Sequence, residues 1–166
     1  MTFIFIPIII VILLLLNIFY IYKVPKDNQW IVERFNKFYT VWDSGIHFTI
    51  PYIYKIVNKV KIDSQIYTFN RITIITKDEI QFTPNIIVDF NIYDSVKFTY
   101  QEKRPMLALE KDIAKIIRYA TSYISSEYLT NNIHSIENQI LDELNTFTNY
   151  YGISVNYLVL ELKETL

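Results

Sequence analysis

The chain begins with a long uncharged stretch, and this stretch constrains its fold more than any other feature. No Asp, Glu, Lys or Arg precedes Lys23, and residues 3–22 read FIFIPIIIVILLLLNIFYIY. A helix rises 1.5 Å per residue, so about 20 residues span roughly the 30 Å of a bilayer's hydrocarbon core. The run lacks the basic start and small-residue cleavage site of a signal peptide. We therefore expect a membrane-anchoring helix within residues 1–22 and a folded domain over residues 23–166.

Aromatic and basic side chains close this run, as they do where a helix leaves a bilayer. The first flanking basic residues follow the run, so the positive-inside rule predicts a single-pass anchor with the domain on the cytoplasmic side. Pro7 leaves open a hairpin that enters and leaves on one face, and either topology puts Lys23 and all later residues on the same side. The membrane-interface contacts expected here are Phe19, Tyr20, Tyr22, Lys23 and Lys26.

Composition argues against several classes of function. The net charge of −1 gives no basic surface for nucleic acid. The absence of cysteine excludes disulfides, thiolate metal sites and palmitoylation. The sequence has no phosphate-binding glycine loop and no nucleophile motif, and it predicts no catalytic, cofactor-binding or metal site. A membrane-tethered hydrolase remains an alternative, and it would require His47 or His134 to meet carboxylates and a Ser or Thr in a pocket.

The first half of the domain has the residue pattern of β-strands. Gln29–Tyr39 alternates apolar and polar residues, which favours one strand. Pro84 removes a hydrogen-bond donor and therefore predicts an edge or a bulge. The further expected strands are Ile46–Ile50, the long run Lys55–Phe69, and a hairpin of Arg71–Thr76 with Ile80–Tyr93 around a tip at 77–79.

The second half changes to a helical period. Apolar residues recur every three or four positions from Pro105 to Ile124, and again from Ile136 to Tyr151. Asn132 or Ser135 is expected to cap the second helix, and Ile153–Leu162 alternates as a final strand. This order predicts an α+β fold with an antiparallel sheet, two helices and a returning strand.

The two glycines and the aromatic residues after the anchor need separate interpretation. Gly45 and Gly152 stand alone in a composition poor in glycine, which predicts structural turns with positive φ. The rings between Trp30 and Phe48 fit either the core of the sheet or an aromatic surface at the lipid headgroups. On the second interpretation, Trp30 and Trp42 join the expected membrane-interface contacts.

Taken in order, these motifs resemble the stomatin/prohibitin (SPFH/Band 7) family, and most closely its stomatin-like branch. The matched pattern is an apolar anchor, then VPxxxxWIVERFxKF, xSGIHFxIP, ITKDxI and GIxV before the last strand. Matched positions are Val24, Pro25, Trp30–Phe35, Lys37, Phe38, Gly45–Phe48, Ile50, Pro51, Thr76–Asp78, Asp94, Gly152, Ile153 and Val155. Ser44 and Ser95 stand where the family usually has proline, and the chain stops at Leu166 without the family's C-terminal coiled-coil extension.

The resemblance implies a non-enzymatic scaffold at the lipid bilayer. It implies a homo-oligomer that organises membrane microdomains or regulates membrane proteins such as channels and proteases, without a cofactor. Asn138, Gln139, Asp142, Asn145 and Asn149 mark the polar side of the second helix, where we expect lateral contacts. The missing extension adds an alternative, a truncated modulator that enters and limits oligomers of full-length relatives.

Overall fold

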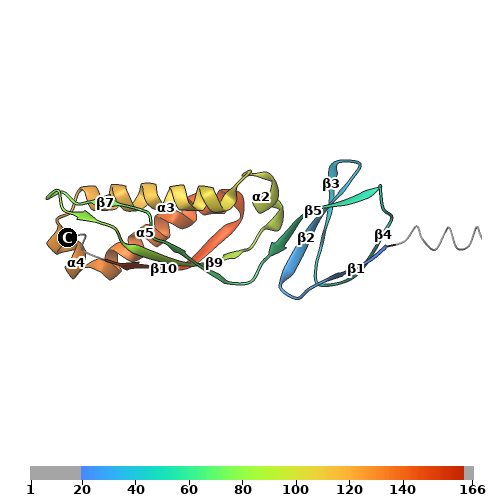
Figure 1. Cartoon of the computed structure of the whole chain (residues 1–166), viewed down its shortest axis with the longest axis horizontal. Helices are drawn as coiled ribbons and strands as arrows, with labels where there is room; N and C mark the ends of the chain where they lie inside the picture. The colour runs from blue at the N-terminus through green and yellow to red at the C-terminus, as the bar shows by residue number, and fades with distance from the viewer. Residues whose placement is uncertain (1–19, 163–166) are drawn as a thin grey trace, which may run out of the picture. The chain divides into compact units, whose positions relative to one another are not determined.

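The computed structural model describes residues 20–162, and the chain divides into two compact units, residues 1–61 and 62–166. Figure 1 shows strands in the first unit, and helices lying against a sheet in the second. The predicted order of an antiparallel sheet followed by helices and a returning strand is confirmed.

Residues 20–61 of the first unit form two small antiparallel sheets. Strand β1 (Tyr20–Val24) pairs with β4 (Gly45–Thr49), and β2 (Asn28–Arg34) lies between β3 (Lys37–Trp42) and β5 (Tyr54–Lys61). One buried cluster of the unit consists of Val24, Trp30, Val32 and Trp42, with Tyr22, Tyr54 and Ile56 packed against it. Ile31 and Val60 are buried as well.

The prediction of a single strand over residues 29–39 is wrong. The chain reverses at Phe35 and Asn36, where φ is 51° and 60°, and β2 and β3 form a hairpin around these two residues. Two consecutive positive φ values are typical of the two-residue turns whose twist matches that of the flanking strands. The apolar–polar alternation continues through this turn, so it could not reveal the reversal.

Tyr20–Tyr22, which were expected to belong to the membrane helix, lie in a strand. Tyr20, Ile21 and Tyr22 lie in β1, opposite Thr49, Phe48 and His47 of β4. Pairing with β4 supplies hydrogen bonds that an apolar sequence alone does not predict. The rest of the predicted anchor, residues 3–19, lies outside the described residues. Within residues 20–162, no helix combines the length and the apolar character needed to cross a bilayer.

The second unit is built on a three-stranded antiparallel sheet in the order β10-β9-β6. The run 55–69 that was expected to be continuous is interrupted at 62–64, and Pro84 falls between two strands. A two-stranded ribbon, β7-β8, completes the strands of the unit. Their bounds are β6 (Gln65–Phe69), β7 (Ile74–Ile75), β8 (Gln81–Phe82), β9 (Asn85–Ile92) and β10 (Ile153–Glu161).

Within residues 62–162, four helices and one 3₁₀ turn connect these strands. They are α2 (Ser95–Tyr100), α3 (Pro105–Ser122), α4 (Ser126–Asn131), α5 (Ile133–Thr148) and η1 (Asn149–Tyr151). The carboxylate of Asp94 caps α2 by accepting from the backbone N–H groups of Val96 and Lys97. Pro105 occupies the first turn of α3, where its missing N–H costs no hydrogen bond. Helix α4 lies between the two helices that the sequence predicted, and the sequence did not predict it.

The core of the second unit lies between the sheet and the helices. Helix α5 packs on β10, and α3 packs on α5 and β7. Their buried stripes include Leu109, Ile113, Ile140 and Leu144, all fully inaccessible. Burying each such side chain contributes about 1.5–3 kcal/mol relative to leaving it exposed.

Gly152 joins the end of the helical segment to β10. Its φ of 77° lies in the left-handed region, and a Cβ there would collide with the carbonyl oxygen of Asp94. The carbonyl of Gly152 accepts from the backbone N–H groups of Tyr93 and Asp94. Glycine therefore allows the return strand to approach the loop that begins α2.

Candidate interaction surfaces

One side of the β1–β4 pair carries large apolar side chains that lie in solvent. Ile21 is directly opposite Phe48, and Lys23 is opposite Ile46. Ile21, Ile46 and Phe48 are 66%, 64% and 68% exposed. Side chains alternate between the two faces of a strand, so the other side of this pair faces the core through Tyr22 and Val24. We call Ile21, Ile46 and Phe48 the apolar face.

Two neighbouring turns of the first unit also carry exposed rings. Phe35 in the β2–β3 turn donates its backbone N–H to the carbonyl of Ile53, 3.4 Å away, just after the fully exposed Tyr52. The guanidinium of Arg34 lies 5.4 Å from the ring centre of Phe35 and 5.9 Å from that of Tyr54. These distances permit cation–π attraction, which holds the cation beside the aromatic surface.

Trp30 and Trp42, expected at the membrane interface, lie in the core with 7% and 8% of their surface exposed. The edge of Tyr22 packs on Trp30 at 5.9 Å between ring centres, and Lys59 places its ammonium 4.2 Å from the Trp30 ring. A buried ring cannot reach a lipid headgroup while the fold is intact. We therefore correct the expectation for these two residues. Tyr20, Lys23 and Lys26 are exposed and Tyr22 is half-buried, while Phe19 lies outside the described residues.

The two histidines lie in different units, and each has its own local contacts. His47 stacks on Trp42, with 4.8 Å between ring centres, and its Nε2 lies 2.7 Å from the carbonyl of Asp43. His134 contacts the Glu137 carboxylate through Nδ1 at 2.8 Å, and the other carboxylate oxygen accepts from the N–H of Leu160. Glu137 therefore binds a backbone N–H group of β10. Over residues 20–162 there is no group of three or more side chains placed to hold a metal ion.

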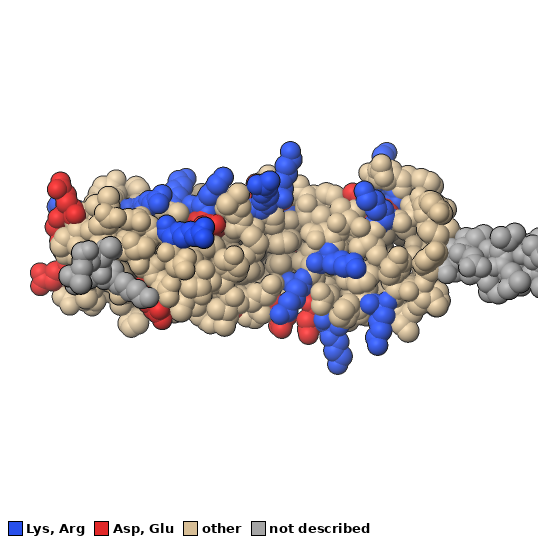
Figure 2. Space-filling view, in the orientation of Figure 1, with Lys and Arg blue, Asp and Glu red and all other residues tan. Residues whose placement is uncertain are grey.

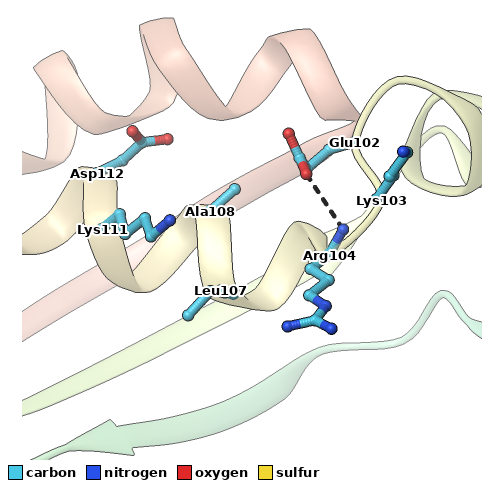
Figure 3. Close-up of a pocket in the computed structure, with 7 residues that line it drawn as sticks. All are labelled: Glu102, Lys103, Arg104, Leu107, Ala108, Lys111 and Asp112. Atoms are coloured by element: carbon cyan, nitrogen blue, oxygen red, sulfur yellow. Dashed lines mark hydrogen bonds between the residues drawn. The ribbon is translucent and has the colours of Figure 1, made fainter.

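A hollow of about 490 Å³ lies at the start of α3, and Figure 3 shows its lining. Lys103, Arg104 and Lys111 bring positive charge to it, while Glu102 and Asp112 bring negative charge. The phenol of Tyr151 donates to Asp112 at 2.9 Å. Burial, reinforced by the charges of Asp112 and Glu102, raises the pKa of Tyr151 well above its usual range, so this phenol stays protonated. The hollow holds charges of both signs, and it contains no paired nucleophile and base.

The polar residues of α5 that were expected to make lateral contacts differ in their exposure. Asn138, Gln139, Asp142 and Asn149 are exposed. Asn145 is half-buried, and its amide group both donates to the carbonyl and accepts from the N–H of Val155. Asn145 therefore holds the free edge of β10 and is not available to a partner.

An all-β unit followed by a helix-covered antiparallel sheet defines an α+β domain, and the described residues show no assembled catalytic centre. Residues 22–163 match the family model described as SPFH domain / Band 7 family, and the chain belongs to this family. The predicted stomatin-like character is confirmed, because the chain is similar to the stomatin-like protein stl-1 of Caenorhabditis elegans, with 26% identity over 133 residues. It is also similar to the human stomatin-like protein 2, mitochondrial, with 21% identity over 130 residues.

Both similarities cover 78% of this chain. The matched region spans 40% of the Caenorhabditis elegans protein and 36% of the human protein. The family membership therefore describes a domain that the relatives also contain, within longer proteins.

Proposed function

We propose that this protein is a non-enzymatic scaffold anchored in a membrane by residues 3–19, with its folded domain on the cytoplasmic side. In this role it self-associates and organises patches of membrane or regulates neighbouring membrane proteins. Membership of the SPFH/Band 7 family supports this role, since the resemblance implies scaffolding at a bilayer. The sequence of residues 3–19 supports the anchor, because it is uncharged and almost entirely apolar.

The observation that carries the proposal is the position of the apolar face. It begins at Ile21, two residues after the proposed anchor of residues 3–19, and it continues across β4 to Ile46 and Phe48. Exposed apolar patches rimmed by polar residues mark contacts with membranes or other proteins. A surface of this kind, joined directly to a bilayer-inserting segment, fits the lipid headgroup region.

An anchor limited to residues 3–19 also supports the placement of the apolar face at the lipid headgroups. As a helix, residues 3–19 would reach about 25 Å, a little less than the hydrocarbon thickness of about 30 Å. Strand β1 would then start close to the boundary between hydrocarbon and headgroups. Lys23 and Lys26 are exposed beside it, and each basic residue near an anionic surface contributes about 1 kcal/mol.

The chain lacks cysteine, so single cysteines can report the depth of individual positions. Phe48→Cys and Ile46→Cys carry a polarity-sensitive fluorophore in the full chain, reconstituted in vesicles with nitroxide-labelled headgroups. We expect a blue-shifted emission and strong quenching at both positions. Tyr123→Cys, an exposed position of the second unit, is the matched control and should show neither effect.

Equal quenching at Phe48→Cys, Ile46→Cys and Tyr123→Cys would show that the apolar face does not rest on the bilayer. If full-length protein were extracted from vesicles by alkaline carbonate, membrane anchoring itself would be wrong.

A further inference from the structure

Helix α3 carries a row of basic side chains on its outer side. Arg104 precedes this helix, and Lys111, Lys115 and Arg118 follow at intervals of seven, four and three residues. At 3.6 residues per turn these intervals place all four on one side, opposite the buried Ile113. All four are exposed, and Figure 2 shows Lys and Arg side chains gathered along α3. We call Arg104, Lys111, Lys115 and Arg118 the basic stripe.

Two members of the basic stripe, Arg104 and Lys111, share the hollow at the start of α3 with Glu102 and Asp112. Even so, the stripe forms no ion pair within residues 20–162, since none of its members lies within ion-pair distance of a carboxylate. Lys115 extends over the ring of Phe147 at 5.4 Å, and Arg118 donates from Nε to the carbonyl of Thr73 at 3.1 Å. Both side chains are thus held in position by neutral groups, and their charges remain available to a partner.

The three-stranded sheet of the same unit has one face that the helices do not cover. The strand register puts Ile66, Ile87 and Val159 on this face, together with Tyr157. Ile66, Tyr157 and Val159 are exposed, although side chains on a solvent-facing sheet surface are usually polar. We call this surface the open sheet face.

The open sheet face carries one exposed carboxylate, that of Glu161, whereas Asp89 on the same face is buried, with 8% of its surface exposed. Asp89 accepts from the hydroxyl of Ser64 and from the amide of Asn156 at 3.2 Å, and Glu161 accepts from the amide of Asn85 at 3.3 Å. These donors are all neutral. Among the described residues of β6, β9 and β10 there is no Lys or Arg. The face therefore combines exposed apolar side chains with the exposed carboxylate of Glu161, which has no cation beside it among the described residues of these strands.

From these two surfaces we infer that the basic stripe of one copy docks on the open sheet face of a second copy. This inference rests on the self-association in the proposed function and names the surfaces that make it. The stripe from Arg104 to Arg118 is about 21 Å long, and the open face of β9 from Asn85 to Asn91 is about 20 Å long. The basic side chains would meet the exposed carboxylate of Glu161, which lies opposite Asn85 at one end of this length. Leu107 beside the stripe adds an exposed apolar contact.

The two surfaces differ, so the contact is head-to-tail. Each copy that uses its stripe leaves its open sheet face free for the next copy. Such contacts produce closed rings when the rotation between copies closes, and open filaments when it does not. Copies anchored in one membrane share one orientation, which favours repetition of the same contact along the bilayer.

Mixed single-cysteine proteins test this geometry in the full chain in vesicles. Differently tagged Leu107→Cys and Val159→Cys proteins are combined and treated with a short bis-maleimide. We expect the mixed crosslink to exceed either crosslink between identical variants. Tyr123→Cys replaces Leu107→Cys as control, because it is exposed near the end of α3 but lies off the stripe. It should give no mixed crosslink.

Charge reversal provides the second measurement. Lys111→Glu with Arg118→Glu should reduce the mixed crosslink about tenfold, and Glu161→Lys in the other copy should restore part of it. Self-association is measured separately by amine-reactive crosslinking and mass analysis of the wild type. Oligomers without the mixed crosslink would overturn the interface and leave the proposed function standing, whereas strictly monomeric protein would overturn both. A charge reversal that lowered only the binding to phosphatidylserine vesicles would assign the stripe to lipid and overturn the inference.

Discussion

At the scale of single residues, Asp78 links two parts of the chain that are far apart in sequence. Its carboxylate accepts from the N–H and hydroxyl of Ser126, at 3.1 and 2.5 Å, and from the hydroxyl of Thr76. These hydrogen bonds, with Ser126 the largest contributor, lower the pKa of Asp78 to about 2. The β7–β8 turn is thereby fastened to the first turn of α4, whose N–H groups lack helical partners.

The lowered pKa of Asp78 predicts how the stability of the fold changes as the pH falls. A carboxyl whose pKa is lower in the folded than in the unfolded protein stabilises the fold above its unfolded value, near 3.8, and loses this effect as the pH falls through about 2. Asp78→Asn should therefore unfold more easily than wild type at pH 5, and the difference should shrink between pH 4 and pH 2. Urea unfolding of the full chain in detergent micelles, followed by circular dichroism, measures both quantities.

Glu79→Gln is the matched control, because Glu79 is adjacent and exposed, and its side chain shows no hydrogen bond in the part of the chain described. It should behave like wild type across the same range. A gap between Asp78→Asn and wild type that stays constant from pH 5 to pH 2 would contradict the role assigned to Asp78.

At the scale of elements, the sequence predicted the order of strands and helices but misplaced several boundaries. The helical period from Pro105 to Ile124 identified α3, since one side of the helix is buried and the period records this directly. The turn at Phe35 and Asn36 was missed because neither residue is glycine, the usual signal for two positive φ values. Tyr20–Tyr22 were assigned to the membrane helix because they continue its apolar run, although apolar and aromatic side chains also suit a β-strand.

The interaction surfaces were predictable to a smaller extent. The sequence marked the aromatic residues after the anchor, but it could not tell the buried Trp30 and Trp42 from the exposed Phe48. That distinction depends on which side of each strand faces the core, and a register shift of one residue exchanges the two sides. The open sheet face was missed for the same reason, since it combines residues from three strands that are distant in sequence.

Strand β10 shows how an element edge is protected. It is an edge strand, and edge strands present unpaired backbone groups that can recruit other chains. Asn145 of α5 satisfies both the N–H and the carbonyl of Val155, at 2.8 and 2.9 Å. Asn145→Ala leaves both groups without these bonds, and we expect a loss of about 1–3 kcal/mol in unfolding free energy. Urea denaturation of the full chain in micelles tests this value.

The exposed Asn138 on the same helix supplies the control for this measurement. Asn138→Ala should change the unfolding free energy by less than about 0.5 kcal/mol, as surface substitutions usually do. Indistinguishable midpoints for Asn145→Ala and Asn138→Ala would mean that Asn145 does not support the edge of β10.

At the scale of the whole molecule, the charge of the chain is almost balanced but unevenly distributed. A net charge of −1 creates little repulsion between copies, so local charge patterns can decide how they meet. The contact proposed between copies depends on the exposed cations of the basic stripe. The contact proposed with the bilayer depends on apolar side chains, whose burial does not weaken with ionic strength.

Salt should therefore separate the two proposed properties of the molecule. The Debye length shrinks from about 10 Å at 0.1 M to about 3 Å at 1 M, so the attraction between stripe and sheet face is screened over this range. We expect oligomer size after amine-reactive crosslinking in vesicles to fall as sodium chloride rises from 0.1 to 1 M. Over the same range, fluorescence quenching at Phe48→Cys should stay constant. Oligomers unchanged at 1 M would exclude a charge-dependent contact, and quenching lost at 1 M would show that electrostatic attraction, not the apolar face, holds the first unit on the membrane.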